Sequence, residues 1–183
     1  MSHFTTIGSV ILNNLTSDIN MNYFKYDIVF QEVPNEISLA LYFTGCPLQC
    51  HGCHSPELWN KNNGKDLSTK VLKDLIQKYR GSISCLLCMG GEWEPIFLLN
   101  ILKIAKNEKL KTALYTGREL IELPTEIINH LDYLKTGPWI EELGGLNSNN
   151  TNQKFFKFSE HIKEDKYVFK THTRSDQLKS RLC

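Results

Sequence analysis

The sequence shows little imbalance of charge and no long apolar run. Its 183 residues carry 21 Lys and Arg against 20 Asp and Glu, a formal net charge of +1. This balance gives no electrostatic reason to expect a nucleic acid or an anionic membrane surface as partner. The most apolar stretch, residues 37–43, is far shorter than the roughly 20 residues of a membrane-spanning helix. We therefore expect neither a nucleic acid nor a membrane as partner.

The start of the chain lacks the basic segment and the cleavage-site pattern of a signal peptide, which favours a cytoplasmic protein. The chain is 41% hydrophobic and 22% charged, as is typical of one ordinary globular domain. No internal repeat or linker divides it. We interpret residues 1–20 as an N-terminal extension and residues 21–183 as a single domain.

The six cysteines are unevenly distributed. Cys46, Cys50 and Cys53 lie close together, Cys85 and Cys88 follow, and Cys183 ends the chain. A disulfide framework is not expected in the cytoplasm. Clustered thiols in a reducing compartment usually bind a metal or carry out redox chemistry.

Strand and helix patterns alternate along the chain. Strands are predicted at residues 23–30, 37–43, 82–89, 110–116 and 132–136, with weaker candidates at 154–158 and 166–170. Helices are predicted at residues 67–80, with Ser68 as cap and Gly81 as stop, at 95–108 from Pro95, and at 118–130 with Pro124 interrupting it. The alternation indicates an α/β fold with a mainly parallel sheet, either open or curled into a partial barrel.

The ends of the predicted strands carry the residues with the most distinctive chemistry. They hold Gly45 and Cys46, then residues 90–92, 115–117 and 136–139. In parallel α/β sheets the site lies beyond the C-terminal ends of the strands. We therefore expect these loops to converge on one rim of the sheet.

The first of these loops has the spacing C-x3-C-x2-C, formed by Cys46, Cys50 and Cys53. Such a loop can offer one thiolate to each of three irons in a cubane cluster, which leaves the fourth iron open to a small chelating ligand, because no fourth cysteine is nearby. The alternative is zinc with His51 or His54 as a further ligand. Three ligands in one short loop suit zinc less well, because zinc is usually held by two separated pairs.

Two further motifs need interpretation. Cys85 and Cys88 are three positions apart in a predicted strand, so they point to opposite faces and are interpreted as core residues. Gly90, Gly91 and Glu92 follow that strand. Glycines allow a ligand to approach the backbone, and a carboxylate can pair with an ammonium group. A plain strand-to-helix turn is the alternative for this segment.

With these residues in view, the sequence resembles the radical S-adenosylmethionine superfamily. More narrowly, it is similar to the small activating enzymes of anaerobic, glycyl-radical ribonucleotide reductases. The likeness runs from about Tyr23 to Phe158 and rests on CPLQCHGCHSPELW, FKYDIVFQEVPNEISLAL, MGGEWEP, LYTG and DYLKTGPWIEELGGLNSNNTNQKFF. One departure is Gly52, where many superfamily members have an aromatic residue. This changes what stacks near the adenine, not the ligation of iron.

The resemblance implies an incomplete (β/α) barrel of about six mostly parallel strands. It implies a [4Fe–4S] cluster on Cys46, Cys50 and Cys53, with S-adenosylmethionine on the fourth iron. The residues expected to bind this second cofactor are Gly52, His54, Gly90, Gly91, Glu92 and Tyr115.

The activity that the resemblance implies is reductive cleavage of S-adenosylmethionine to a 5′-deoxyadenosyl radical. That radical would generate a glycyl radical on an anaerobic ribonucleoside-triphosphate reductase, with electrons from a flavodoxin-like or other low-potential donor. Residues 115–117, 137–139 and 147–153 are expected to meet the reductase. The alternatives are a different glycyl-radical enzyme as partner, a small-molecule substrate, or a non-enzymatic zinc-stabilised interaction module.

Overall fold

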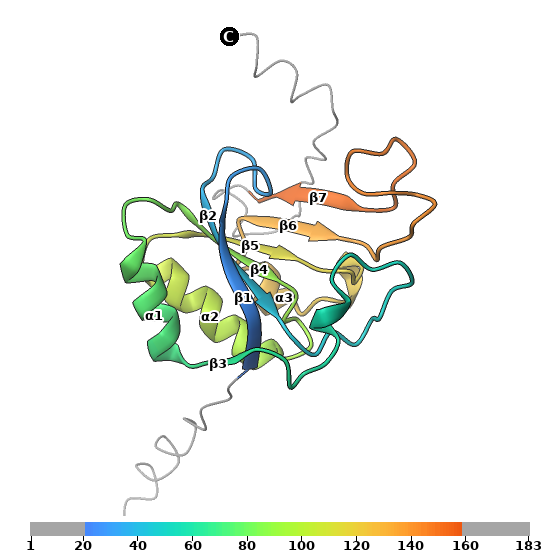
Figure 1. Cartoon of the computed structure of the whole chain (residues 1–183). Coiled ribbons are helices and arrows are strands. Elements are labelled where there is room, and N and C mark those ends of the chain that lie inside the picture. The colour runs from blue at the N-terminus through green and yellow to red at the C-terminus, as the bar shows by residue number, and fades with distance from the viewer. Residues whose placement is uncertain (1–20, 159–183) are drawn as a thin grey trace, which may run out of the picture.

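A computed structural model describes residues 21–158 of the chain (Figure 1). The interpreted extension 1–20, the weak strand candidate at 166–170 and Cys183 lie outside the described residues. The division of the chain into an extension and a domain therefore stays a prediction.

The described chain forms one seven-stranded sheet with the order β3-β1-β2-β4-β5-β6-β7. The strands are β1 (Met21–Val29), β2 (Ser38–Phe43), β3 (Lys65–Leu67), β4 (Cys85–Met89), β5 (Lys111–Tyr115), β6 (Tyr133–Thr136) and β7 (Lys154–Lys157). The helices are α1 (Thr69–Lys78), α2 (Pro95–Asn107) and α3 (Thr125–Ile128), with short 3-10 turns η1 (Pro56–Leu58) and η2 (Leu120–Glu122).

The centre of the sheet is parallel and its margins are antiparallel. Strands β2, β4, β5 and β6 run parallel to one another, whereas β1, β3 and β7 are added in antiparallel pairs. The predicted α/β class with a parallel core is confirmed. The sheet has seven strands where about six were expected, and three of its strand pairs are antiparallel. The curling of the sheet into a partial barrel stays a prediction.

Alternation along the strands gives the sheet two different apolar faces. One face, which includes Leu39, Leu41 and Leu86, is buried in the same cluster as the inward residues of α1 and α2, and these helices lie together on one side of the sheet (Figure 1). The other face carries a smaller cluster that includes Leu87 and Tyr133.

The two core cysteines follow this alternation. Cys85 belongs to the cluster on the second face and Cys88 to the cluster beneath the helices, and both are fully buried. Burial raises the pKa of the Cys85 thiol to about 12, so this thiol is protonated at neutral pH. The prediction that the pair cannot converge on one metal is confirmed.

Local signals placed the Ser68 cap of α1 and the Pro95 start of α2 correctly. The Ser68 hydroxyl accepts from the backbone N–H of Val71 at 3.3 Å and caps α1. The expected start of that helix was too early, because Leu67 belongs to β3 and pairs with Met21. The helix expected at 118–130 is instead split into η2 and the short α3. Pro124 lies between them, because proline lacks an N–H and disfavours helical backbone at the preceding residue.

A buried polar cluster lies where β4, β5 and β6 begin. Glu36 is 5% exposed and accepts hydrogen bonds from Lys111, from Ser84 at 2.7 Å and from Tyr133 at 2.8 Å. Burial alone would raise the pKa of Glu36, but these three donors outweigh it and hold the pKa below its ordinary value. This carboxylate therefore joins the starts of three strands, at the end of the sheet opposite the loops that follow β2, β4, β5 and β6.

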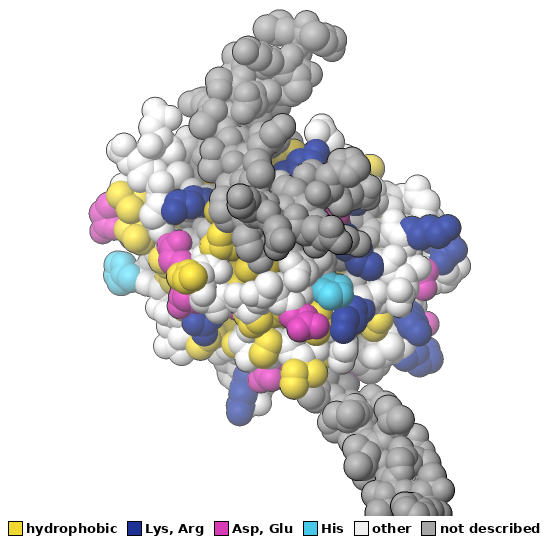
Figure 2. All heavy atoms as spheres, turned by 180° about the vertical axis from the view of Figure 1, so that it is seen from behind, with side chains coloured by type: hydrophobic (Ala, Val, Ile, Leu, Met, Phe, Trp, Pro, Cys, Tyr) yellow, Lys and Arg dark blue, Asp and Glu magenta, His cyan; other side chains and the backbone are white. Residues whose placement is uncertain are grey.

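The surface matches the balanced charge of the sequence. On the face shown in Figure 2, charged side chains of both signs lie among hydrophobic ones over the described surface. Among residues 21–158, no helix has both the length and the apolar character needed to cross a membrane.

Candidate metal centre

The loops that follow the parallel strands lie at one edge of the sheet, as expected (Figure 1). Their backbones are tied together. The Gly90 amide donates to the Tyr115 carbonyl at 2.8 Å, and the Thr116 amide donates to the Lys135 carbonyl at 2.9 Å. The loops after β4, β5 and β6 therefore form one continuous rim.

The cysteine loop follows β2 and is shaped by left-handed backbone. Gly45, Gln49 and Gly52 have φ angles of +91°, +45° and +66°. The amides of Gly45 and Cys46 both donate to the Leu58 carbonyl, at 2.7 and 3.0 Å, and so close the loop at its base. Left-handed residues bend a chain sharply, which folds this segment back on itself instead of extending the strand.

The thiols of Cys46, Cys50 and Cys53 are all free and partly buried. The backbone amide of Ser55 lies 3.4 Å from the Cys53 sulfur and donates to it. Burial raises the pKa of Cys46, and backbone amides of its own loop act in the opposite direction. Amides directed at sulfur stabilise the thiolate form that binds iron.

The three thiols of the cysteine loop fit an iron–sulfur cluster by their chemistry. A structural zinc site needs four ligands converging on one point. A cubane cluster has no such need, because each thiolate binds its own iron. The donor set is also purely sulfur, as iron–sulfur clusters prefer.

Gly90 and Gly91 lie beside the cysteine loop and adopt left-handed φ angles of +82° and +101°. A Cβ at Gly90 would lie 2.6 Å from the Trp93 ring, and one at Gly91 would lie 3.0 Å from the Phe43 ring. Both positions therefore require glycine, and their left-handed turns lead the chain from β4 to Glu92.

Glu92 is 6% exposed. Its Oε1 atom lies 3.8 Å from Nε of Arg118, and its Oε2 atom is buried without a hydrogen-bond partner among the described residues. Burial raises the pKa of Glu92, while Thr116 and Arg118 act in the opposite direction. The charge of Glu92 also contributes to raising the pKa of Cys46. A carboxylate oxygen with free acceptor capacity therefore lies within electrostatic reach of the cysteine loop.

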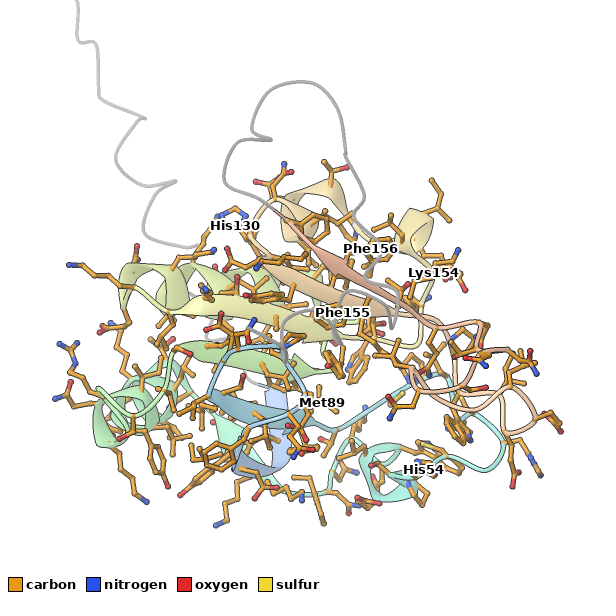
Figure 3. The ribbon with its side chains drawn as sticks, turned by 90° about the horizontal axis from the view of Figure 1, so that it is seen from above. His54, Met89, His130, Lys154, Phe155 and Phe156 are labelled. Atoms are coloured by element: carbon orange, nitrogen blue, oxygen red, sulfur yellow. The ribbon has the colours of Figure 1, made fainter. Side chains whose placement is uncertain are left out.

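Tyr115 reaches the rim with its backbone, while its side chain lies on the second face. Its hydroxyl donates to the Glu32 carbonyl in the connection between β1 and β2, and its ring makes an edge contact with Phe155 at 6.3 Å. Met89 and Phe155 mark this face in Figure 3. The role of Tyr115 in cofactor binding therefore stays a prediction, and only the position of its backbone at the rim supports it.

His54 and Gly52 meet the loop that follows β6. The centroid of the His54 ring lies 4.3 Å from that of the Trp139 ring. A Cβ at Gly52 would lie 2.8 Å from Oε2 of Glu141 and 3.5 Å from Nε1 of Trp139. The segment that follows Thr136 therefore lies directly against the cysteine loop.

Two charged residues at this rim were not singled out by the sequence interpretation. Lys135 lies near the end of β6, where burial lowers its pKa to about 8 and the nearby Cys50 thiol acts in the opposite direction. Arg118 follows β5 and faces Glu92. A lysine inside an otherwise apolar, buried strand was an available signal for the first. Arg118 had no such signal in the sequence, because its role depends on Glu92 in a neighbouring loop.

Residues 37–161 match the protein family described as "4Fe-4S single cluster domain". The match covers more than half of the chain, and the chain belongs to this family. The iron–sulfur cluster predicted from the three cysteines agrees with that membership.

Similar proteins include activating enzymes. The Pyruvate formate-lyase-activating enzyme of Clostridium pasteurianum is 32% identical over 105 residues, which are 52% of this chain and 43% of that enzyme. The Anaerobic ribonucleoside-triphosphate reductase-activating protein of Vibrio cholerae is 25% identical over 134 residues, which are 67% of this chain and 86% of that protein. The chain thus spans less than half the length of the clostridial relative.

Proposed function

We propose that this protein is a cytoplasmic radical S-adenosylmethionine activating enzyme that generates a glycyl radical on an anaerobic ribonucleoside-triphosphate reductase. The observation that carries the proposal is that cysteine thiols and a buried carboxylate lie at one rim of the sheet. Three partly buried thiols share this rim with a buried carboxylate that acts electrostatically on Cys46 and has one oxygen without a partner among the described residues. The two activating enzymes among the similar proteins support this assignment.

The thiols of Cys46, Cys50 and Cys53 would hold three irons of the cluster, and the fourth iron would take the amine and carboxylate of S-adenosylmethionine. The free Oε2 of Glu92 suits the amino group, because an iron-bound amine keeps N–H bonds that a buried carboxylate oxygen can accept. Lys135 suits the carboxylate, since a pKa of about 8 leaves it mainly protonated at neutral pH. The amino group and the carboxylate would then each have a partner on the chain.

When bound, the cluster and S-adenosylmethionine supply one electron and a carbon-centred radical that takes a hydrogen atom from a glycine of the partner. The chain's own residues bind and orient. Gly90 and Gly91 give the loop that carries Glu92 its left-handed turns, because a side chain at either position would meet the ring of Trp93 or of Phe43. The electron would come from a flavodoxin-like or other low-potential donor.

The choice of partner rests on two observations. The likeness to the Vibrio cholerae protein extends over 86% of that protein's length, whereas the clostridial enzyme is matched over 43% of its length. The motifs after β6, from Gly137 to Gln153, also resemble the reductase-activating group. The higher identity with the clostridial enzyme favours, as the second candidate, a glycyl-radical enzyme of the pyruvate formate-lyase type.

Electron paramagnetic resonance distinguishes the two partners. Reduced, iron-loaded protein is mixed anaerobically with S-adenosylmethionine and either the reductase or the lyase from the same organism. We expect the doublet of a glycyl radical with the reductase. A doublet with the lyase alone would keep the chemistry and overturn the partner. A Cys46→Ala variant serves as the control and should give no signal with either enzyme.

A further inference from the structure

Trp139 is anchored against the cysteine loop while its polar atom is left without a partner. Its ring lies 4.3 Å from the His54 ring, at an angle of 49°. On another side, a Cβ at Gly145 would lie 3.8 Å from the same indole. The indole Nε1 is buried and has no hydrogen-bond acceptor among the described residues. A buried N–H without an acceptor costs free energy.

This N–H lies beside the turn that separates two iron-binding cysteines. A Cβ at Gly52 would lie 3.5 Å from Nε1 of Trp139 and 2.8 Å from Oε2 of Glu141. Gly52 stands between Cys50 and Cys53, and the Cys53 amide donates to the Cys50 carbonyl at 3.1 Å. The loop after β6 therefore occupies the space that a side chain at position 52 would need.

The loop that carries Trp139 is held by its own hydrogen bonds. The side-chain amide of Asn152 donates to the Pro138 carbonyl at 3.0 Å. The Thr151 hydroxyl donates to the Gly144 carbonyl at 3.1 Å. These bonds hold the backbone on both sides of Trp139.

We propose that Trp139 is a positioning residue for the iron–sulfur cluster: its ring supports the turn between Cys50 and Cys53, and its N–H donates to a sulfur atom of the bound cluster. The acceptor follows from the location, since thiolate and sulfide sulfurs are the groups that a cluster would bring to this turn. Hydrogen bonds to cluster sulfurs stabilise the reduced, more negative state and raise the reduction potential. The inference rests on the iron–sulfur site of the proposed function.

The test compares Trp139→Phe, which keeps an aromatic ring and removes the N–H, with wild-type protein. The reduction potential of the cluster is measured by anaerobic titration without S-adenosylmethionine, and iron release to a chelator is timed. We expect a lower potential and faster iron release in the variant. Glu141→Gln is the matched control on the same loop. It removes a negative charge near the turn, so its potential should stay unchanged or rise.

An unchanged potential in a fully loaded Trp139→Phe protein would overturn the inference, as would an equal fall in both variants. If the Trp139→Phe variant does not load iron, circular dichroism of the iron-free chains shows whether the variant is folded. A folded chain that cannot load supports the positioning role, and an unfolded one contradicts a role specific to the cluster. Failure of the wild-type chain to bind iron would instead overturn the proposed function.

Discussion

The Oε1 atom of Glu92 lies 3.8 Å from Nε of Arg118, while its Oε2 atom is buried with no hydrogen-bond partner among the described residues. The distance is too long for a direct hydrogen bond, yet close enough for the guanidinium to favour the ionised carboxylate. Arg118 thus offsets part of the cost of burying this charge. The other oxygen remains free to accept a cationic ligand at the rim.

Replacing Glu92 with Ala should weaken the binding of S-adenosylmethionine and leave the iron content unchanged. A charged hydrogen bond of this kind contributes roughly 1.5–3 kcal/mol, or about 10- to 150-fold in affinity. Equilibrium binding to iron-loaded protein measures the change. Glu122→Gln is the control, because Glu122 also faces Arg118 but lies further out, with a side chain 46% exposed. An affinity that is equal in Glu92→Ala and wild-type protein would remove Glu92 from the site.

Single replacements of Cys46, Cys50 or Cys53 by Ala should abolish the cluster, because each thiolate serves a different iron. The same change at Cys85 or Cys88 should leave about four irons per chain. Their thiols lie on opposite faces of the sheet and are fully buried. Iron analysis with a visible spectrum checks the result. Loss of iron in a folded Cys85→Ala protein would show that the core thiols take part in ligation.

Replacing Lys135 with Met should lower the affinity for S-adenosylmethionine by about 10-fold or more at neutral pH, through loss of a charged donor. Because burial lowers the pKa of Lys135 to about 8, the wild-type side chain loses its charge as the pH rises through that value. Wild-type affinity should therefore fall above about pH 8, as this pKa dictates, and affinity in the variant should lack that fall. Parallel pH profiles would exclude Lys135 from binding.

Replacing Glu36 with Ala should destabilise the fold by about 2–3 kcal/mol, since three donors lose their acceptor and half-exposed Lys111 recovers part of its hydration. The folded-state pKa of Glu36 is depressed below 4.5. Its stabilising effect is therefore present above pH 4.5 and is lost as the pH falls through the folded-state value. Denaturant unfolding measures both effects.

Asp74→Ala is the control for Glu36→Ala. Asp74 pairs with Lys70 on the exposed surface of α1 at 2.6 Å, and such pairs contribute only about 0.2–0.5 kcal/mol. Equal losses of stability in the two variants would contradict the structural role given to the Glu36 cluster.

Much of the fold could be predicted from the sequence, because helix caps and prolines agreed with the periodicity of the hydrophobic residues. The strand at β4 is apolar on both faces and is buried on both, and Pro95 opens α2 as expected. The short β3 was missed, since Lys65 and Asp66 are exposed and the strand exists through its pairing with β1. Long-range pairing of this kind has no local sequence signal.

The residues of the candidate site also differ in whether a local sequence pattern predicts them. The cysteine spacing and the glycine pair were evident, because short-range chemistry fixes which residue types stand together. Arg118 and Trp139 were harder to assign, since each acts on a residue of another loop. Such contacts depend on the register of the parallel strands, which brings the loops after β2, β4, β5 and β6 to one edge.

The most direct test of the proposed activity is anaerobic reduction of iron-loaded wild-type protein in the presence of S-adenosylmethionine, with 5′-deoxyadenosine and methionine measured over time. We expect both products to form in equal amounts without any partner, and a Cys50→Ala chain to form neither. Colourless protein that retains zinc, or iron-loaded protein that leaves S-adenosylmethionine intact under reduction, would contradict it.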